Sequence, residues 1–209
     1  MELTKLALRD YKVIYVPEYK RVLCKTLIQL SMNTWMPINV RKKDDFRISD
    51  NIISISAITN IRKISEEYRC VSSGKKIFIS RKNTNLSRIT NEEKVADLFR
   101  KRGFEIVHTE DLSYKQQVEL FSAAICVVGA TGAAMTNLVY CNPNTVFGCI
   151  IPKKYDFCIY SSIAHMVGMR MLFLDAKVIR SGIAISLDQC KVDIDECCGY
   201  IDELEKMIR

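Results

Sequence analysis

The sequence predicts an α/β fold in which a parallel β-sheet is covered by helices on both faces. Between about Lys75 and Asp175, short apolar runs rich in β-branched residues alternate with segments of helical spacing. One of these runs, ICVVG at residues 125–129, is wholly apolar, which is typical of a strand buried on both faces. Strands and helices that alternate at this spacing form right-handed βαβ units, so we expect a Rossmann-like sheet.

Each strand of this sheet is predicted from its apolar run. KIFIS is the first such run and FEIVH is the second, and both end where polar residues begin. The later runs are equally short. The expected strands cover residues 76–80, 104–108, 125–129, 145–150 and 171–174.

Helices are expected between these strands and near the last residue. Ser113 can cap one of them, and Gln116 completes a capping box. Gly103 is placed to end the helix before it. The expected helices cover residues 91–102, 113–123, about 156–167 and 195–208, and residues 130–140 are expected to form a turn and the start of a helix.

Residues 1–72 show a weaker β-α-β pattern. Strands are expected at 12–16, 37–40 and 51–56, and a helix is expected at 19–30. These elements are too few to complete a Rossmann-like domain. We therefore divide the chain into an N-terminal α/β portion, residues 1–72, and a Rossmann-like domain, residues 73–209.

The composition fits a folded protein with an anionic partner. Of the residues, 48% are hydrophobic and 26% are charged, so the chain can bury a core. The formal net charge of +7 favours phosphate as a partner and keeps nucleic acid as an alternative. Residues 1–10 carry no signal sequence, and no apolar run approaches the roughly 20 residues that span a bilayer. We expect a cytoplasmic protein without a membrane span.

The cysteines favour a reducing compartment. There are nine, an odd number, spread through the chain without a disulfide framework. Most stand in apolar surroundings, where a thiol behaves as a small hydrophobe. The adjacent Cys197 and Cys198 have no CxxC partner, and the chain has only two histidines, so we expect no metal site.

Ligands of open parallel sheets bind beyond the carboxyl ends of the strands. Arg81 directly follows the first strand, and Arg88 precedes Asn91 and Glu92 at the start of the next helix. Two arginines and a helix N-terminus in this place can bind phosphate oxygens. From spacing alone, a helix capped by Thr90 or Asn91 and two solvated arginines are slightly favoured over an anion site.

The segment GATGAAMTN, residues 129–137, follows the third strand. Small residues let the backbone approach a ligand closely, and Thr131, Thr136 and Asn137 supply hydrogen-bonding groups. The segment is neither a GxGxxG fingerprint nor a Walker A loop. A tight turn whose small residues pack on the sheet is the alternative interpretation.

The loop TEDLS, residues 109–113, follows the second strand. A loop in this place can contact a base or ribose, which makes Glu110 a candidate, whereas Asp111 and Ser113 are explained almost as well by capping. His108 has no identifiable partner. His165 lies within a predicted helix and is interpreted as structural.

The segments KKIFISR, SRITNEE, GFEIVHTEDLSYKQQVELF and VVGATGAAMTNLVYCNPNT resemble, in order and spacing, the core of glycosyltransferase family 61. The resemblance implies a GT-B architecture, in which two Rossmann-like domains face each other and the C-terminal one holds a nucleotide-sugar. It also implies inverting, metal-independent transfer from a UDP-, GDP- or dTDP-sugar to a glycan acceptor, with no other cofactor.

The resemblance assigns nucleotide-sugar binding residue by residue. Many members carry histidine where this chain has Thr131, so that the role of this histidine is in doubt here. The catalytic base is left unassigned, with Asp10, Glu18, Asp44 and Asp45 available on the N-terminal side. The predicted donor-binding residues, including Glu110 and Thr131, are Arg81, Arg88, Asn91, Glu92, Glu110, Gln117, Thr131, Gly132, Ala133, Thr136 and Asn137.

Two other classes of function stay open. The short N-terminal portion is consistent with a non-catalytic nucleotide- or sugar-phosphate-binding module that works with other domains of a longer chain. The net charge of +7 is the only support for a basic nucleic-acid-binding domain, since no recognition helix or aromatic-basic RNA motif is visible. We rank both below the transferase and expect no nucleic-acid partner.

Overall fold

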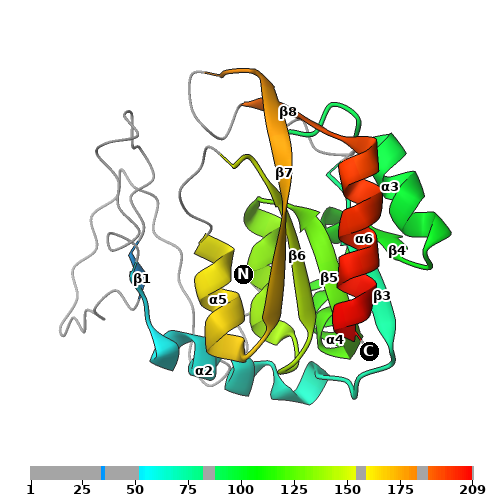
Figure 1. Cartoon of the computed structure of the whole chain (residues 1–209). Coiled ribbons are helices and arrows are strands. Elements are labelled where there is room, and N and C mark those ends of the chain that lie inside the picture. The colour runs from blue at the N-terminus through cyan, green and yellow to red at the C-terminus, as the bar shows by residue number, and fades with distance from the viewer. Residues whose placement is uncertain (1–33, 36–51, 82–87, 154–158, 183–187, 209) are drawn as a thin grey trace.

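A computed structural model describes residues 34–35, 52–81, 88–153, 159–182 and 188–208 (Figure 1). The strands expected at 12–16 and 37–40, the helix at 19–30 and the four candidate base residues lie outside the described residues. The division of the chain at residue 72 stays a prediction.

The described chain is built on one six-stranded sheet with the order β4-β3-β5-β6-β7-β8. The first five of these strands are parallel, and only β8 runs antiparallel, beside β7. This confirms the Rossmann-like prediction. The strands are β3 (Lys75–Ile79), β4 (Glu105–Val107), β5 (Ala124–Ala130), β6 (Val146–Ile151), β7 (Arg170–Arg180) and β8 (Gln189–Val192).

Helices cover both faces of the sheet, which gives three layers (Figure 1). One face carries α3 (Glu92–Lys101) and α6 (Ile194–Ile208). The other carries α4, α5, α2 and the 3-10 helix η5, which pack around one apolar cluster. These elements are α2 (Ile55–Ile64), α4 (Tyr114–Ala123), η5 (Ala133–Tyr140) and α5 (Ile159–Val167).

Alternation along the strands separates the two cores. On β3, Ile77 and Ile79 point to the α4 side while Phe78 stacks on Phe99 of α3, with ring centroids 4.8 Å apart. Along β5, every residue except Ile125 is buried. The wholly apolar run of the sequence is therefore a central strand, as predicted.

The order of the strands reverses once along the chain. From β3 the chain crosses through α3 to β4 at one edge, and it then returns through α4 to β5 on the other side of β3. The carboxyl ends of β3 and β5 therefore diverge into helices on opposite faces. Such a switch point is where open α/β sheets bind ligands.

The capping box at Ser113 is confirmed. The Ser113 side chain accepts a hydrogen bond from Gln116 N, and the Gln116 side chain accepts one from Ser113 N at 2.9 Å. Most other expected bounds between residues 75 and 151, and those of the last helix, agree with the structure to within one or two residues, but two elements after β6 differ. The strand expected at 171–174 is the eleven-residue β7, and β8 was not predicted, although Cys190 and Val192 alternate as buried residues there.

The strand prediction for residues 51–56 was wrong over its last part. Only Ile52–Ile53 (β2) forms a strand, antiparallel to Thr34–Trp35 (β1), and Ile55 begins α2. The apolar residues Ile58 and Ile61 fall on one face of this helix and pack on the same core as η5. A short apolar run fits either period, and here tertiary packing selected the helix.

Within the described ranges, we find no helix of the length and hydrophobicity that a membrane crossing requires.

Candidate functional site

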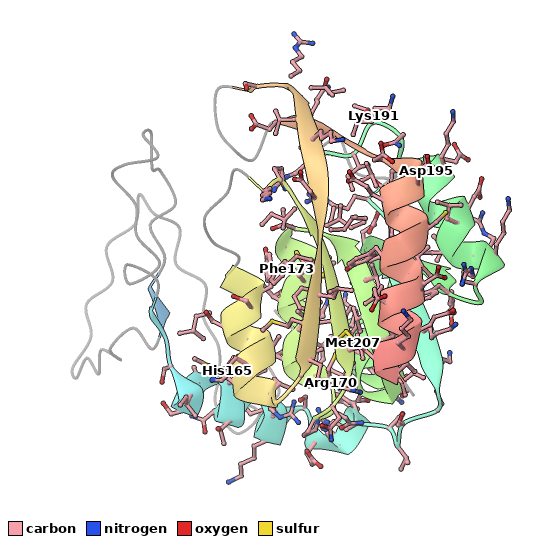
Figure 2. The ribbon with its side chains drawn as sticks, viewed as in Figure 1. His165, Arg170, Phe173, Lys191, Asp195 and Met207 are labelled. Carbon is pink, nitrogen blue, oxygen red and sulfur yellow. The ribbon has the colours of Figure 1, made fainter. Side chains whose placement is uncertain are left out.

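The candidate site lies at the switch point, where the carboxyl ends of β3 and β5 are adjacent. Ile79 pairs with Gly129 in parallel register, so Arg81 leaves β3 beside the segment Thr131–Gly132 that leaves β5. Figure 2 orients this edge: Lys191 and Asp195 lie toward the end of the molecule that holds the carboxyl ends of the strands, and Arg170 lies at the opposite end.

Arg81 lies directly over Gly132. Its Nη1 donates to the carbonyl oxygen of Thr131 at 3.3 Å, and a Cβ built on Gly132 would overlap with the same nitrogen. The φ of Gly132 is 168°, which any residue adopts, so the glycine is required here by close approach rather than by conformation. Sequence reasoning expected small residues for close approach to a ligand. The structure adds a close approach to the arginine itself.

Glu92 joins the start of α3 to the end of β3. Its side chain is buried, and Oε1 accepts hydrogen bonds from Ser80 Oγ at 2.7 Å and from Arg81 N at 2.6 Å. The carboxylate therefore contacts the backbone that carries Arg81. The link through Ser80 was not found from sequence, because the serine ends an apolar strand and carries no motif.

Arg88 lies near the same loop. It lines a small, mainly apolar pocket at the carboxyl edge, to which Thr131 also contributes. Cys190 N donates to Arg88 O at 2.6 Å, so that β8 holds the segment in place. The predicted arginine pair is thus gathered around Thr131. The pocket is lined by Arg88, Ile89, Ala130, Thr131, Ile150, Pro152, Ala176 and Cys190.

The Asn91 side chain binds the backbone of β8, and among the described residues it forms no hydrogen bond with Thr131 or Gly132. Its Nδ2 donates to Val192 O at 2.8 Å and its Oδ1 accepts from Val192 N at 3.0 Å, which continues the pairing of β8. No side-chain capping bond to α3 is present. The amide therefore docks β8 against the start of α3.

Gln117 and Asn137 connect the loops that follow β4 and β5. Gln117 Nε2 donates to the carbonyl oxygens of Thr109 and Leu112, at 3.1 and 3.0 Å. Its Oε1 accepts from Asn137 Nδ2 at 2.8 Å. The 3-10 turn η4 (Thr109–Asp111) and the helix η5 are therefore fixed to each other.

The other predicted residues lie on the surface around this framework. Glu110 is exposed on η4, and Ala133 and Thr136 are exposed in the first half of η5. Thr136 Oγ1 donates to Ala133 O at 2.7 Å, within the same turn. Their exposure at the carboxyl edge leaves them accessible to a ligand.

The histidines differ in position. His108 directly follows β4 at the carboxyl edge and is half-buried, and its Nδ1 has no hydrogen-bond partner among the described residues. His165 is exposed in the last turn of α5, at the opposite end of the molecule from Lys191 (Figure 2). His165 therefore lies away from the candidate site.

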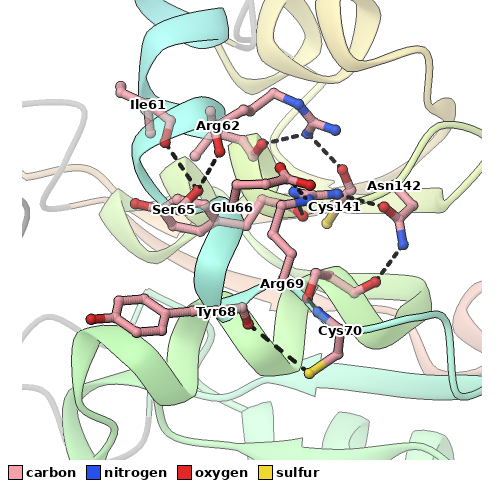
Figure 3. A network of polar contacts seen from close by, with 12 residues as sticks. Ile61, Arg62, Ser65, Glu66, Tyr68, Arg69, Cys70, Cys141 and Asn142 are labelled. Carbon is pink, nitrogen blue, oxygen red and sulfur yellow. Dashed lines mark hydrogen bonds and ion pairs between the residues drawn. The ribbon is translucent and has the colours of Figure 1, made fainter.

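Sequence reasoning missed a second arginine pair, at the far end of η5 (Figure 3). Arg62 donates to Val139 O and Cys141 O, both at 2.7 Å, and Arg69 donates to Tyr140 O at 2.6 Å. Burial and the charge of Arg69 lower the pKa of Arg62. Burial raises the pKa of Cys141 to about 12, so this thiol stays protonated at neutral pH. The pair therefore holds the carboxyl end of η5 against the segment that contains α2 and Arg69.

The sequence model of glycosyltransferase 61 matches residues 12–148. The chain belongs to this family. The match includes every predicted donor-binding residue and ends within β6. No curated protein matches the chain closely enough to be reported as a relative. The family makes the chain a glycosyltransferase, and the switch point is the part of its sheet where a substrate is expected.

Proposed function

We propose that the switch point binds a nucleotide-sugar and that this family 61 glycosyltransferase moves the sugar to a glycan acceptor. The position of Arg81 over Gly132 carries the proposal. The N-terminal end of a helix carries partial positive charge and attracts anions. Arg81 lies at the beginning of η5, where a diphosphate would be attracted both by the guanidinium and by the helix end.

The proposed chemistry assigns a charge role to the arginines. The acceptor hydroxyl attacks the anomeric carbon, its proton passes to a base, and the bond to the diphosphate breaks with inversion. Negative charge grows on the departing diphosphate, and Arg81 and Arg88, which both lie near Thr131, would stabilise it. Because the arginines supply positive charge, we propose that transfer requires no metal ion.

Free cysteines support a cytoplasmic location within this proposal. The described cysteines form no disulfide, and most of them are buried. Burial raises the pKa of Cys126 and of Cys197 to about 12, so both stay as unreactive thiols at neutral pH. Such thiols persist in a reducing compartment.

Nucleotide affinity tests the proposal. UDP, GDP, dTDP and CMP are titrated into the full chain by calorimetry, with and without EDTA, and thermal shift checks the ranking. We expect one diphosphate to bind, with the same affinity in EDTA. Arg81→Ala should weaken it by roughly 10- to 100-fold, the loss of one or two charged hydrogen bonds.

The matched control is Arg100→Ala, since Arg100 is exposed at the other end of α3 and pairs there with Asp97. It should leave the affinity unchanged. If no nucleotide binds the wild type, or if Arg81→Ala binds as well as wild type, the donor site is not here. Release of free sugar from the matching nucleotide-sugar, or its transfer, distinguishes an enzyme from a module that only binds.

A further inference from the structure

We propose that Glu92 is a positioning residue, which holds Arg81 in place for the donor diphosphate and neither contacts the donor nor removes a proton. The inference rests on the proposed function. It changes the role of a residue that sequence reasoning assigned to direct binding.

The contacts of Glu92 define this role. A single carboxylate oxygen, Oε1, accepts from Ser80 Oγ at 2.7 Å and from Arg81 N at 2.6 Å. Both donors lie immediately beyond β3, and Glu92 is the first residue of α3. The buried carboxylate therefore fixes the direction in which the chain leaves the sheet, and that direction determines where the guanidinium of Arg81 lies.

The surroundings of Glu92 hold its side chain in place. Burying a charge is costly unless hydrogen bonds compensate, and here a hydroxyl and a backbone N–H do so. The N-terminal end of α3 adds a favourable helix dipole. With only 7% of its surface exposed, the Glu92 side chain has little access to an acceptor hydroxyl.

The close contact with Gly132 leaves the guanidinium of Arg81 little freedom of position. The guanidinium lies so close to Gly132 that no space remains for a Cβ. A small change in the direction of the chain at Arg81 would therefore either press the guanidinium into η5 or withdraw it from Thr131 O. An anchor on the backbone of Arg81 itself prevents both.

Three substitutions separate the possible roles of Glu92. Glu92→Ala removes both acceptor bonds. Glu92→Gln keeps an oxygen that can accept them but cannot act as a base. Glu93→Ala is the matched control, because Glu93 is the next residue of the same helical turn and is exposed.

The first experiment is calorimetric titration of the full-length variants with UDP, GDP and dTDP, at a temperature where circular dichroism shows each to be folded. We expect Glu92→Ala to weaken the wild-type ligand about 10-fold, Glu92→Gln to stay within about 3-fold, and Glu93→Ala to match wild type. Unchanged affinity in Glu92→Ala overturns the inference. If the wild type binds none of the nucleotides, the proposed function itself fails.

A double-mutant cycle shows whether Glu92 acts through Arg81. In the Arg81→Ala background, Glu92→Ala should cause no further loss of affinity, because the side chain that it positions is gone. Two losses that add fully would mean that Glu92 contacts the donor independently, and this overturns the inference.

Sugar release from the nucleotide-sugar tests the role of a base. Glu92→Gln should keep kcat and the acidic limb of its pH profile. Loss of turnover with unchanged nucleotide affinity would instead assign proton transfer to Glu92. Should Glu92→Ala fail to fold, Ser80→Ala replaces it, with an expected loss of about 3-fold that disappears in the Arg81→Ala background.

Discussion

Two arginine pairs with the same sequence spacing lie at opposite ends of η5 and have different roles. Arg62 and Arg69 hold the carbonyl groups at its carboxyl end, whereas Arg81 and Arg88 surround the loop at its amino end. Carbonyl groups at a helix C-terminus need donors and favour cations, so the first pair is stabilising as it stands. The second pair lies at the end of η5 that attracts anions. Position relative to the helix, more than spacing, separates a structural arginine from a functional one.

The largest effect on stability is expected when Arg62, one member of the structural pair Arg62 and Arg69, is removed. Arg62→Ala leaves the carbonyl groups of Val139 and Cys141 without their charged donor. We expect a loss of roughly 3 kcal/mol in the free energy of unfolding and a Tm lower by about 10 °C. Nucleotide affinity, measured on the folded variant, should not change.

Urea and thermal unfolding measure this prediction, with Lys63→Ala as the control, because Lys63 is the exposed neighbour of Arg62 on α2. A folded Arg62→Ala with wild-type stability would mean that water replaces the guanidinium without cost. Weaker nucleotide binding would mean that the two ends of η5 are coupled.

The second prediction concerns the amino end of η5, where we expect the opposite result: weaker nucleotide binding with little change in stability. Gly132→Ala places a Cβ where the guanidinium of Arg81 lies, and a flexible arginine can move away at low cost. We expect stability to change by less than about 1 kcal/mol and nucleotide affinity to fall roughly tenfold. Calorimetry and thermal unfolding on the same sample give both values.

Gly199→Ala is the control, because a Cβ there meets nothing within 4 Å. It should bind nucleotide as wild type does. If Gly132→Ala binds normally, Arg81 does not need its observed position, and the distinction between the two arginine pairs fails.

The same contrast shows what sequence can and cannot predict here. The sheet, its helices and the capping box at Ser113 follow from local patterns of apolar and capping residues, which each segment carries in itself. Arg81 was predicted as a site residue because it follows a strand at the carboxyl edge of the sheet, and Gly132 because its segment resembles the small-residue loop of the family; both stay predictions. Arg62 and Arg69 were missed because their partners lie more than seventy positions away in the chain and are backbone groups, which leave no trace in the sequence.

Glu92 and Asn91 make the same point at neighbouring positions. Sequence reasoning placed both in the donor site on the basis of resemblance. In the structure one side chain turns to the end of β3 and the other to β8. Their directions depend on how α3 begins and on a strand that was not predicted, so motif matching alone did not distinguish them.

A third prediction concerns the bridge between the two loops. Gln117→Ala removes the donor to the carbonyl groups of Thr109 and Leu112 and the acceptor of Asn137. We expect a loss of about 1 kcal/mol in stability, and Asn137→Ala should cost little more once Gln117 is gone. Thermal unfolding of both single variants and the double variant measures the coupling. Fully additive losses would show that the loops are fixed by other contacts.

The smallest effect is expected for the ion pairs of Glu205 at the surface, one of which involves an arginine, Arg102. Glu205 of α6 accepts from Lys76 at 3.0 Å and pairs with Arg102 at 3.1 Å. The hydrogen bond from Lys76, with Arg102 beside it, lowers the pKa of Glu205 against the opposing effect of desolvation. A carboxyl with a lowered pKa stabilises the fold above its ordinary pKa, and this contribution is lost as the pH falls through the lowered value.

Glu205→Gln should therefore cost below about 1 kcal/mol at neutral pH, because exposed pairs are screened by solvent. The difference from wild type should shrink with added salt and vanish in acid, as followed by urea unfolding across pH. Arg62→Ala should keep its full cost over the same range, because the partners of Arg62 are carbonyl groups that do not titrate. The opposite result would contradict this distinction: a stability loss in Arg62→Ala that depends on salt and pH, together with a loss in Glu205→Gln that does not.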